Sequence, residues 1–400
     1  MNRIYSVTLA GVFIATAGVV FFQKLGSEKT ALSNRSSSSG SAYEQNSRLS
    51  EIRPAKSSQR IIKRSKPKGL SDYLLKNPSE INSLTAEQAA ELVVAFANDR
   101  GLKLPGLTSI DKNVARELAK YEGIWLQLTS LTSIDKDVAY ELAKYEGRLN
   151  LAGLTSIDQD TTRELAKYEG DWLKLSGLTS IDQDVAYELA KWGETGAQLY
   201  LEGLTSIDKG VAYELAKYDG SIVLGLSSID NDVAEELAKK DGGQLHLWGL
   251  VSIDKDVAQA LSRFGGTYLS LKGVELIDKD VARELSNSDV SWLDLTGLTS
   301  IDSDVAQEMA QFQGQLSFSN LSSIDREAAE KLANYTGYAG RRMYINGGTN
   351  GGANLDPDPQ ILEILNSNPA IQLPSKYRMT ENGAIMKPEA RAGVNCASSG

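Results

Sequence analysis

The chain is poor in the residues that build catalytic centres. Among its 400 residues there is one cysteine, Cys396, and one histidine, His246. A single cysteine excludes an intramolecular disulfide and a cysteine-based metal cluster. A Ser-His-Asp or Cys-His site would have to use His246, but neither a G-x-S-x-G elbow nor a nearby cysteine accompanies it. Because phosphate loops and dinucleotide fingerprints are also missing, we predict no enzymatic activity, no cofactor and no metal.

Basic residues are scarce outside the N-terminal segment. Residues 1–68 contain 12 Lys or Arg and 3 Glu, whereas the whole chain contains 42 basic and 52 acidic residues. The part of the chain after residue 68 is therefore strongly acidic. Proteins that bind nucleic acids need clustered Lys and Arg to displace counterions from phosphates. We therefore expect no nucleic acid among the partners.

Only one long apolar run is present, Ile4–Phe22, and it contains no charged residue. Its length suits a bilayer crossing, so we predict that residues 1–26 form a membrane anchor. A signal peptide cleaved at Ala15-Thr16-Ala17 is the alternative. The flanking basic residues slightly favour a cytoplasmic location for the rest of the chain, but long domains translocate largely regardless of such charges. We expect a protein that faces the periplasm or the cell exterior, anchored to the membrane or secreted if the segment is cleaved.

The next segment, residues 27–68, is rich in Ser, Lys and Arg and poor in aromatic residues, which predicts a disordered linker. Its basic part, Arg53–Lys68, could lie on an anionic surface, although a solvated linker is the simpler interpretation. We place an N-terminal capping repeat at 69–101 and a repeat domain at 102–337. A C-terminal cap and flexible tail follow at 338–400, with one helix expected at Pro359–Leu365.

A repeated motif, usually Ser-Ile-Asp, dominates the repeat domain, and successive copies are 22 to 26 residues apart. A divergent first unit without the aspartate begins at Leu84. Such periodicity is typical of solenoids, in which each repeat packs on its neighbours. The repeated aspartates are Asp111, Asp135, Asp158, Asp182, Asp208, Asp230, Asp254, Asp278, Asp302 and Asp325.

Each repeat predicts one strand and one helix. The segment Trp125–Leu128 alternates leucines with variable residues, as in a strand that buries one face. Asp135 suits a helix N-cap, and Val138 and Leu142 then share one apolar helical face. Gly147 is expected to end the helix in a left-handed conformation. Strand and helix alternate, so we predict an α/β solenoid with one parallel strand and one helix in each repeat of about 24 residues.

The repeat Leu149–Gly170 follows the order of a leucine-rich repeat and resembles most the type found in bacterial surface proteins. Asp stands where that pattern has Gly, and no repeated cysteine is present. The resemblance covers about residues 84–337. It implies a horseshoe with the strands on the concave face and a role in adhesion or protein interaction. The family has no shared catalytic residues.

The variable strand residues should form a solvent-exposed concave face in three columns, and four of the five tryptophans fall there. Exposed aromatic residues among polar groups are typical of binding hot spots, whereas large side chains can also pack merely against neighbouring strands. We predict a protein partner on this face, with polysaccharide binding or a passive structural role in the envelope as alternatives. The predicted ligand-binding residues are Trp125, Arg148, Trp172, Lys174, Tyr200, His246, Trp248, Tyr268 and Trp292.

Paired aspartates such as Asp135 and Asp137 offer hard oxygen ligands to divalent cations. Helix capping by the first and a favourable interaction of the second with the helix dipole account for the same pattern. We therefore interpret these pairs as structural. The extra residues Gly193–Gly196 lengthen one repeat, which we interpret as length variation rather than a functional loop.

Overall fold

The computed structural model describes residues 69–70, 72–193, 196–345, 358–374 and 377. All of them belong to one compact unit of the chain, Arg64–Gly400. The predicted membrane segment, the predicted linker 27–68, and residues 346–357 and 378–400 of the predicted C-terminal region lie outside the described residues. Among those described, no helix combines the length and apolar character that a bilayer crossing requires.

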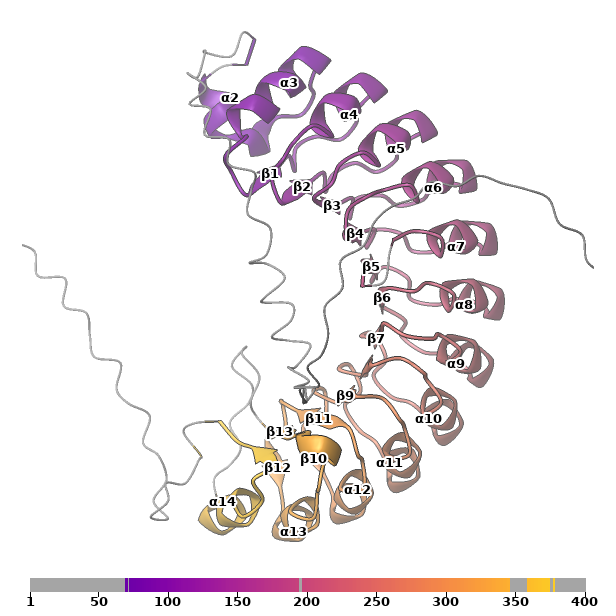
Figure 1. Ribbon diagram of the computed structural model, residues 1–400, viewed down its shortest axis with the longest axis vertical. Coiled ribbons are helices and arrows are strands. Elements are labelled where there is room, and N and C mark those ends of the chain that lie inside the picture. The colour runs from indigo at the N-terminus through magenta and orange to yellow at the C-terminus, as the bar shows by residue number, and fades with distance from the viewer. Residues whose placement is uncertain (1–68, 71, 194–195, 346–357, 375–376, 378–400) are drawn as a thin grey trace, which may run out of the picture. The chain divides into compact units, whose positions relative to one another are not determined.

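Twelve short strands form one parallel sheet in which neighbouring strands follow chain order (Figure 1). Corresponding positions of successive repeats are paired, so that Leu126 lies between Leu102 and Leu149. The strands of this sheet are β1 (Gly101–Lys103), β2 (Trp125–Gln127), β3 (Arg148–Asn150), β4 (Trp172–Lys174), β5 (Gln198–Leu201), β6 (Ser221–Leu224), β7 (Gln244–Leu247), β8 (Tyr268–Ser270), β9 (Trp292–Asp294), β11 (Gln315–Phe318), β13 (Met343–Ile345) and β14 (Ile371–Gln372). A separate parallel pair is formed by β10 (Ser300–Ile301) and β12 (Ser323–Ile324).

The helices lie on the outer side of the curved repeat stack and the strands of the main sheet line its inner side (Figure 1). The repeats therefore form an α/β solenoid with a leucine-rich-repeat-like arrangement, as predicted. The α-helices are α2 (Asp72–Lys76), α3 (Ala86–Ala95), α4 (Lys112–Leu118), α5 (Lys136–Leu142), α6 (Gln159–Leu165), α7 (Gln183–Leu189), α8 (Lys209–Leu215), α9 (Asn231–Ala238), α10 (Lys255–Leu261), α11 (Lys279–Ser286), α12 (Ser303–Met309), α13 (Arg326–Leu332) and α14 (Pro359–Asn366). Two short 3₁₀ helices are Pro78–Glu80 and Tyr338–Gly340.

The core lies between the sheet and the helices. Leu126 and Leu128 of one repeat are fully buried, and the helical residues Val138 and Leu142 close the same layer from the other side. Each such side chain contributes about 1.5–3 kcal/mol when it leaves water. Because every repeat supplies the same set of apolar residues, the core is continuous along the whole stack.

All ten repeated aspartates are helix N-caps, as predicted. The Asp135 carboxylate accepts a hydrogen bond of 2.8 Å from the backbone N–H of Val138, and Asp111 accepts two, from Asn113 and Val114. These bonds satisfy N–H groups that have no partner within a helix. In the divergent first unit, Thr85 replaces the aspartate and forms a capping box with Gln88 at the start of α3.

The predicted role of Gly147 is wrong. Helix α5 ends at Leu142, and the backbone of Gly147 is not in the left-handed region. Instead, the Tyr145 hydroxyl reaches the preceding repeat and donates a hydrogen bond of 2.8 Å to the Gly123 carbonyl. A Cβ on Gly147 would collide with the Tyr145 ring and lie 2.7 Å from the Gly123 oxygen. Position 147 therefore requires glycine because the Tyr145 ring and the backbone of the preceding repeat lie so close to it, and not because of a turn.

Tyr145 belongs to a row of buried side chains that we call the interior ladder. The rings of the interior ladder stack between repeats. The ring centroids of Tyr168 and Trp192 are 5.8 Å apart, and so are those of Trp192 and Tyr218. The Trp192 indole N–H donates a hydrogen bond of 2.9 Å to the Tyr168 carbonyl. This ladder thus accounts for the fifth tryptophan. Its members are Tyr121, Tyr145, Tyr168, Trp192, Tyr218, Lys240, Phe264, Phe312 and Tyr335.

Lys240 is the one lysine of the interior ladder, and only 1% of its surface is exposed. Its ammonium donates a hydrogen bond to the Tyr218 carbonyl, as Tyr145, Trp192 and Tyr335 do to carbonyls of the repeat before them. Burial lowers the pKa of Lys240 to about 8, although Asp219 acts in the opposite direction. A cation is therefore held inside the stack with one backbone acceptor.

Ion pairs join the helices of neighbouring repeats. Arg163 on α6 contacts Glu188 on α7 at 3.1 Å, and Lys191, just after α7, contacts the same carboxylate at 2.9 Å. The Glu188 side chain is 3% exposed. Burial alone raises its pKa, but hydrogen bonds and charge from the two cations outweigh that effect and lower it. Arg116, Glu141 and Lys144 repeat this arrangement between α4 and α5.

Two strands and a helix continue the stack beyond residue 337. β13 pairs with β11, β14 pairs with β13, and α14 lies beside α13. The helix expected at Pro359–Leu365 is present as α14, with Asp358 as its N-cap. Leu362 and Leu365 are fully buried, so this segment covers the apolar end of the last repeats.

Candidate binding surface

The variable strand residues occupy the inner face of the sheet in the three predicted columns. The register of β2 and β3 aligns Trp125 with Arg148 in column 1 and Gln127 with Asn150 in column 2. Column 2 continues through Lys174, Tyr200 and, after Val223, His246. Column 3 consists of the residues that follow the second strand leucine and includes Glu202, Trp248 and Lys272.

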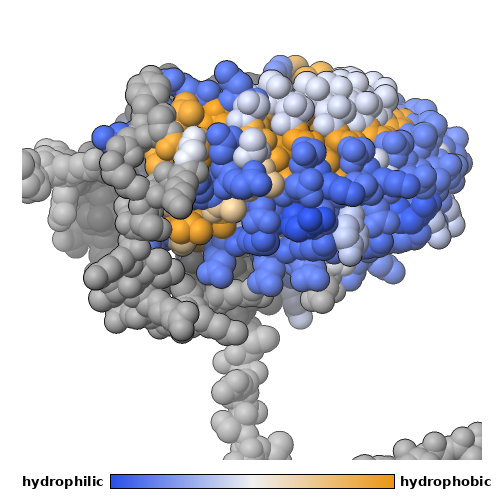
Figure 2. Space-filling view, turned by 90° about the horizontal axis from the view of Figure 1, so that it is seen from above, coloured by the Kyte–Doolittle hydropathy of each residue, from blue (hydrophilic) through white to orange (hydrophobic). Residues whose placement is uncertain are grey.

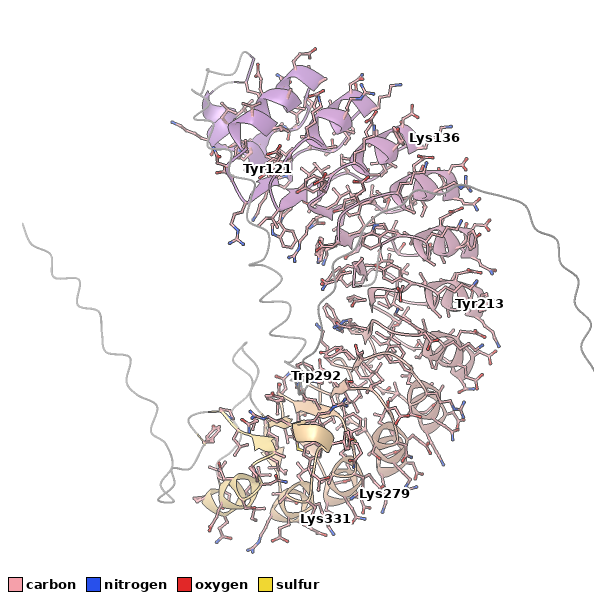
Figure 3. The ribbon with its side chains drawn as sticks, in the orientation of Figure 1. Tyr121, Lys136, Tyr213, Lys279, Trp292 and Lys331 are labelled. Atoms are coloured by element: carbon pink, nitrogen blue, oxygen red, sulfur yellow. The ribbon has the colours of Figure 1, made fainter. Side chains whose placement is uncertain are left out.

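Eight rings on this face form an almost continuous series of contacts, which we call the aromatic ridge. Its members are Trp125, Trp172, Tyr200, Trp248, His246, Tyr268, Trp292 and Tyr344, in order of contact. Successive centroids are 4.9 to 6.4 Å apart. Trp292, near the C-terminal end of the ridge, lies on the inner side of the stack (Figure 3). Sequence analysis missed Tyr344 because β13 lies beyond the regular repeats.

The predicted exposure of these rings is only partly correct. Trp125, Tyr200 and Trp292 are half-buried, and Trp172 is only 9% exposed. Neighbouring strands are about 4.8 Å apart, so large rings in the same column cannot stand clear of one another. They tilt and pack edge to face, as Trp125 and Trp172 do with an interplanar angle of 75°. Packing between strands therefore accounts for part of the recurrence of aromatic residues along the sheet.

Three cations lie over rings of the ridge. Arg148 lies 4.9 Å from the Trp125 ring centroid, Lys174 lies 5.3 Å from that of Tyr200, and Lys272 lies 3.2 Å from that of Trp248. These distances are typical of cation–π contacts. Lys272 was not among the predicted ligand-binding residues. The signal was present, because Trp248 precedes it in the same column by one repeat.

The three cations differ in their acidic neighbours. Lys174 forms an ion pair of 2.8 Å with Glu202, and Arg148 has Asp171 at 3.9 Å. Within the described part of the chain, no carboxylate lies within ion-pair distance of Lys272. Its pKa is lowered by partial burial, against the attraction of Asp294 and Glu202.

His246 is a neutral imidazole in the middle of the ridge. Its Nε2 lies 3.1 Å from the side-chain oxygen of Gln244, so Nε2 carries the proton and donates. Burial, reinforced by the charge of Lys272, lowers the pKa of His246 to about 3. The other ring nitrogen, Nδ1, and the neighbouring Trp248 Nε1 have no hydrogen-bond partner among the described residues. One acceptor and one donor are therefore left unsatisfied side by side.

The carboxylates of this face do not form a hydrolytic pair. Asp294 is 8% exposed and accepts hydrogen bonds from Tyr268 at 2.9 Å and Ser270 at 3.0 Å. Glu202 follows β5, four strands away from β9 in the sheet, which corresponds to about 19 Å. Paired glycosidase carboxylates are less than about 10 Å apart. Within the described residues, no three His, Cys, Asp or Glu side chains are grouped as metal ligands would be.

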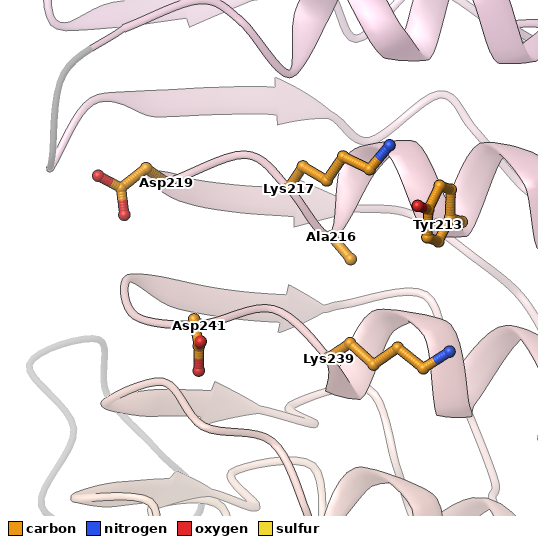
Figure 4. Close-up of a pocket in the computed structure, with 6 residues that line it drawn as sticks. All are labelled: Tyr213, Ala216, Lys217, Asp219, Lys239 and Asp241. Carbon is orange, nitrogen blue, oxygen red and sulfur yellow. The ribbon is translucent and has the colours of Figure 1, made fainter. Parts of the chain in front are cut away.

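The rest of the surface offers fewer groups that could bind a ligand than the inner strand face does. Seen from above, hydrophilic residues cover most of the visible surface and one hydrophobic band crosses it (Figure 2). A depression of about 310 Å³ is lined by residues around α8 and α9, among them Lys217, Lys239, Asp219 and Asp241 (Figure 4). Both lysines already pair with glutamates of their own repeats, Lys217 with Glu214 at 2.7 Å. The depression is open and has no converging polar groups, so it has little to hold a ligand.

Comparisons with known proteins give structural likeness only. No family model matches the chain, and no curated protein sequence matches it. A chain in the crystal structure of the Rad7 and Elc1 complex of yeast is similar over 80% of this chain and 90% of that one, at 15% identity and a TM-score of 0.41. A chain in the TLR13–ssRNA13 complex is similar over 76% of this chain and 50% of that one, at 14% identity and a TM-score of 0.39.

Proposed function

We propose that this protein is a non-catalytic binding module that holds a protein partner on its inner strand face. The observation that supports this most directly is the aromatic ridge, which extends from β2 to β13 with three cations placed on its rings. Aromatic and basic side chains with little freedom lose little entropy on binding and dominate most interfaces. The finer resemblance to bacterial surface repeats belongs to the same proposal.

Polysaccharide binding is less well supported. Sugar rings stack on open aromatic faces, but here Arg148 and Lys272 cover the faces of Trp125 and Trp248, and Trp172 is nearly buried. A passive spacer would need no ridge at all. Both alternatives remain outcomes of the experiment below.

A photo-crosslinking side chain tests the proposal without removing a ridge ring. Replacing Gln198, in column 1 of the inner face, should yield a discrete cross-linked protein in intact cells. The matched control is Lys136, which lies on the outer side of the stack (Figure 3). A glycan smear from Gln198 would instead support polysaccharide binding. Equal products from both positions, or none from either, would contradict a binding role for the inner face.

We also propose that residues 1–26 anchor the repeat domain outside the cytoplasm. The support is the uncharged apolar run Ile4–Phe22 and the basic, serine-rich stretch that follows it. Protease added to intact cells should digest the repeat domain and leave a membrane-bound N-terminal fragment. Full protection in intact cells, with digestion after lysis, would place the domain in the cytoplasm instead.

A further inference from the structure

The inner face has a charge opposite to that of the chain. The whole chain carries 52 acidic and 42 basic residues. On the three strand columns, however, the basic side chains outnumber the acidic ones, which are Glu202 and Asp294. The basic side chains of these columns are Lys103, Arg148, Lys174, Lys272 and Arg342.

The central cations of this face are held in place before any ligand arrives. Arg148, Lys174 and Lys272 each lie over a ring of the ridge at 3.2 to 5.3 Å. A ring restricts the rotamers of a long basic side chain without neutralising its charge. Less entropy is therefore lost when such a cation forms an ion pair with a partner.

Lys272 is the strongest of the three as an anchor. It has no ion-pair partner among the described residues, and it lies over the ring of Trp248, whose indole N–H is unsatisfied. The adjacent His246 Nδ1 is unsatisfied as well. Both of these ring atoms are buried, so the exposed Lys272 ammonium is the group that pairs with a carboxylate, and the Trp248 ring beneath it fixes its position. Such carboxylates are present in a peptide that carries acidic residues.

We propose that the inner face binds an acidic peptide segment of a partner protein, with Lys272, Trp248 and His246 forming the central carboxylate subsite. This inference rests on the proposed function and names the chemistry of the partner. The turns that precede the strands carry exposed acidic residues, among them Glu146, Glu169 and Asp219. A long anionic polymer would extend across this rim and be repelled there, whereas a short acidic segment contacts only the basic strand columns.

The test uses the purified full chain and two fluorescein-labelled peptides of equal length, oligoglutamate and oligoglutamine. Fluorescence anisotropy should show binding of oligoglutamate that weakens as salt rises, and no binding of oligoglutamine. Lys272→Met should weaken oligoglutamate binding at least about fivefold. This loss lies between the effects of removing an exposed and a buried ion pair. Lys136→Met on the outer side removes the same charge and should leave binding unchanged. Equal binding of the two peptides, or equal effects of the two substitutions, would overturn the inference.

The single histidine supplies a local readout. Because His246 is the only imidazole in the chain, its nuclear magnetic resonance signals report on this subsite alone. They should shift on addition of oligoglutamate to the wild type and to Lys272→Arg, which keeps the charge, whereas Lys272→Met should need at least about fivefold more peptide for the same shift. Unshifted signals in the wild type would contradict the subsite even if the peptide bound elsewhere. If polygalacturonate binds and oligoglutamate does not, the ligand of the inner face is an anionic glycan and the proposed acidic peptide is wrong.

The two proposals fail in different ways. If Gln198 cross-links to a protein partner but oligoglutamate does not bind, the acidic peptide is wrong and the binding function stands. If oligoglutamate binding is absent and no cross-link forms at Gln198, both are wrong.

Discussion

At the scale of single residues, the Tyr-x-Gly pair that recurs in several repeats, such as Tyr145 and Gly147, forms a contact between repeats. The Tyr145 ring lies where a Cβ of Gly147 would be, and its hydroxyl bonds to the carbonyl of Gly123 in the preceding repeat. Sequence analysis identified the glycine but assigned it a turn. It could not do better, because the reason for the glycine comes from a ring and a backbone that only the fold brings together.

Gly147→Ala should therefore destabilise the protein, by about 1–3 kcal/mol in the free energy of unfolding, as overpacking does. Gly210→Ala is the matched control. Gly210 lies in the first turn of α8, where the nearest atom to an added Cβ is the end of the flexible Gln183 side chain at 3.0 Å. Alanine is favoured over glycine within helices, so this change should be neutral or slightly stabilising. Urea unfolding of both variants measures the difference, and similar losses in the two would refute the packing argument.

Lys240 makes stability depend on pH in an unusual direction. Its pKa falls from 10.5 in the unfolded chain to about 8 in the folded one, because burial disfavours the cation. Between these values the unfolded chain binds more protons, so the contribution of Lys240 to stability rises with pH from about 8 to 10.5. Below pH 8 the buried cation lowers stability by its full amount.

Lys240→Met should remove this dependence. Subtracting the unfolding free energy of the variant from that of the wild type cancels the titration of the tyrosines, whose own pKa values are raised by burial. The difference should increase steadily from about pH 8 to 10.5. A difference that stays flat over this range would mean that Lys240 titrates as an exposed lysine does.

At the scale of elements, the repeated aspartates and the alternating leucines determine where helices and strands form. Both signals act over a few residues, which is why sequence analysis placed the strand at Trp125–Leu128 and the cap at Asp135 correctly. The ion pairs between helices were not predicted. Glu188 and Arg163 are one repeat apart in sequence, and only the stacking of α6 on α7 brings them together.

Glu188→Gln should lower the free energy of unfolding by about 2 kcal/mol at neutral pH, since hydrogen bonds to charged partners are lost from a buried site. Because the folded pKa of Glu188 is lowered, its contribution is complete above the unfolded value of 4.5 and is lost as pH falls through the folded pKa. The variant should therefore lose less stability than the wild type on acidification.

Glu164→Gln is the control for this substitution. Glu164 occupies the same helical position in the preceding repeat, but it is 25% exposed and, within the described part of the chain, its ion pair is with Lys167 of the same repeat. Its loss should cost less than about 1 kcal/mol. Thermal unfolding between acid and neutral pH compares the two, and equal effects would contradict a special role for the ion pair between repeats.

At the scale of the whole repeat domain, the fold was predictable and the state of its inner face was not. Periodicity gave a parallel sheet backed by helices, because every repeat must bury the same leucines against its neighbours. The columns from Trp125 to Trp292 were also placed correctly. Their half-burial matches the alternative that large side chains pack against neighbouring strands, and its extent could not be predicted because it depends on how rings from different strands fit together in the fold.

Stability should be local along the stack. Leu199 of β5 is fully buried, and Leu199→Ala should cost about 2–5 kcal/mol by leaving a cavity. Since each repeat contacts only its neighbours, the loss should concentrate in β4, β5 and β6 and their helices. Hydrogen exchange followed by mass spectrometry should show faster exchange there and unchanged rates in α12 and α13. A uniform increase throughout would show instead that the domain unfolds as a single unit.

The in-register pairing of the strands has a consequence for how such a chain can change its length. Neighbouring strands of the repeats pair at equivalent positions, and each helix from α4 to α13 begins at an equivalent aspartate. A duplication or deletion that runs from one such aspartate to the next, as from Asp158 to Asp182, therefore joins two surfaces that already match. Unequal recombination within the gene can lengthen or shorten the binding face by one strand at a time, while both ends of the stack keep their caps.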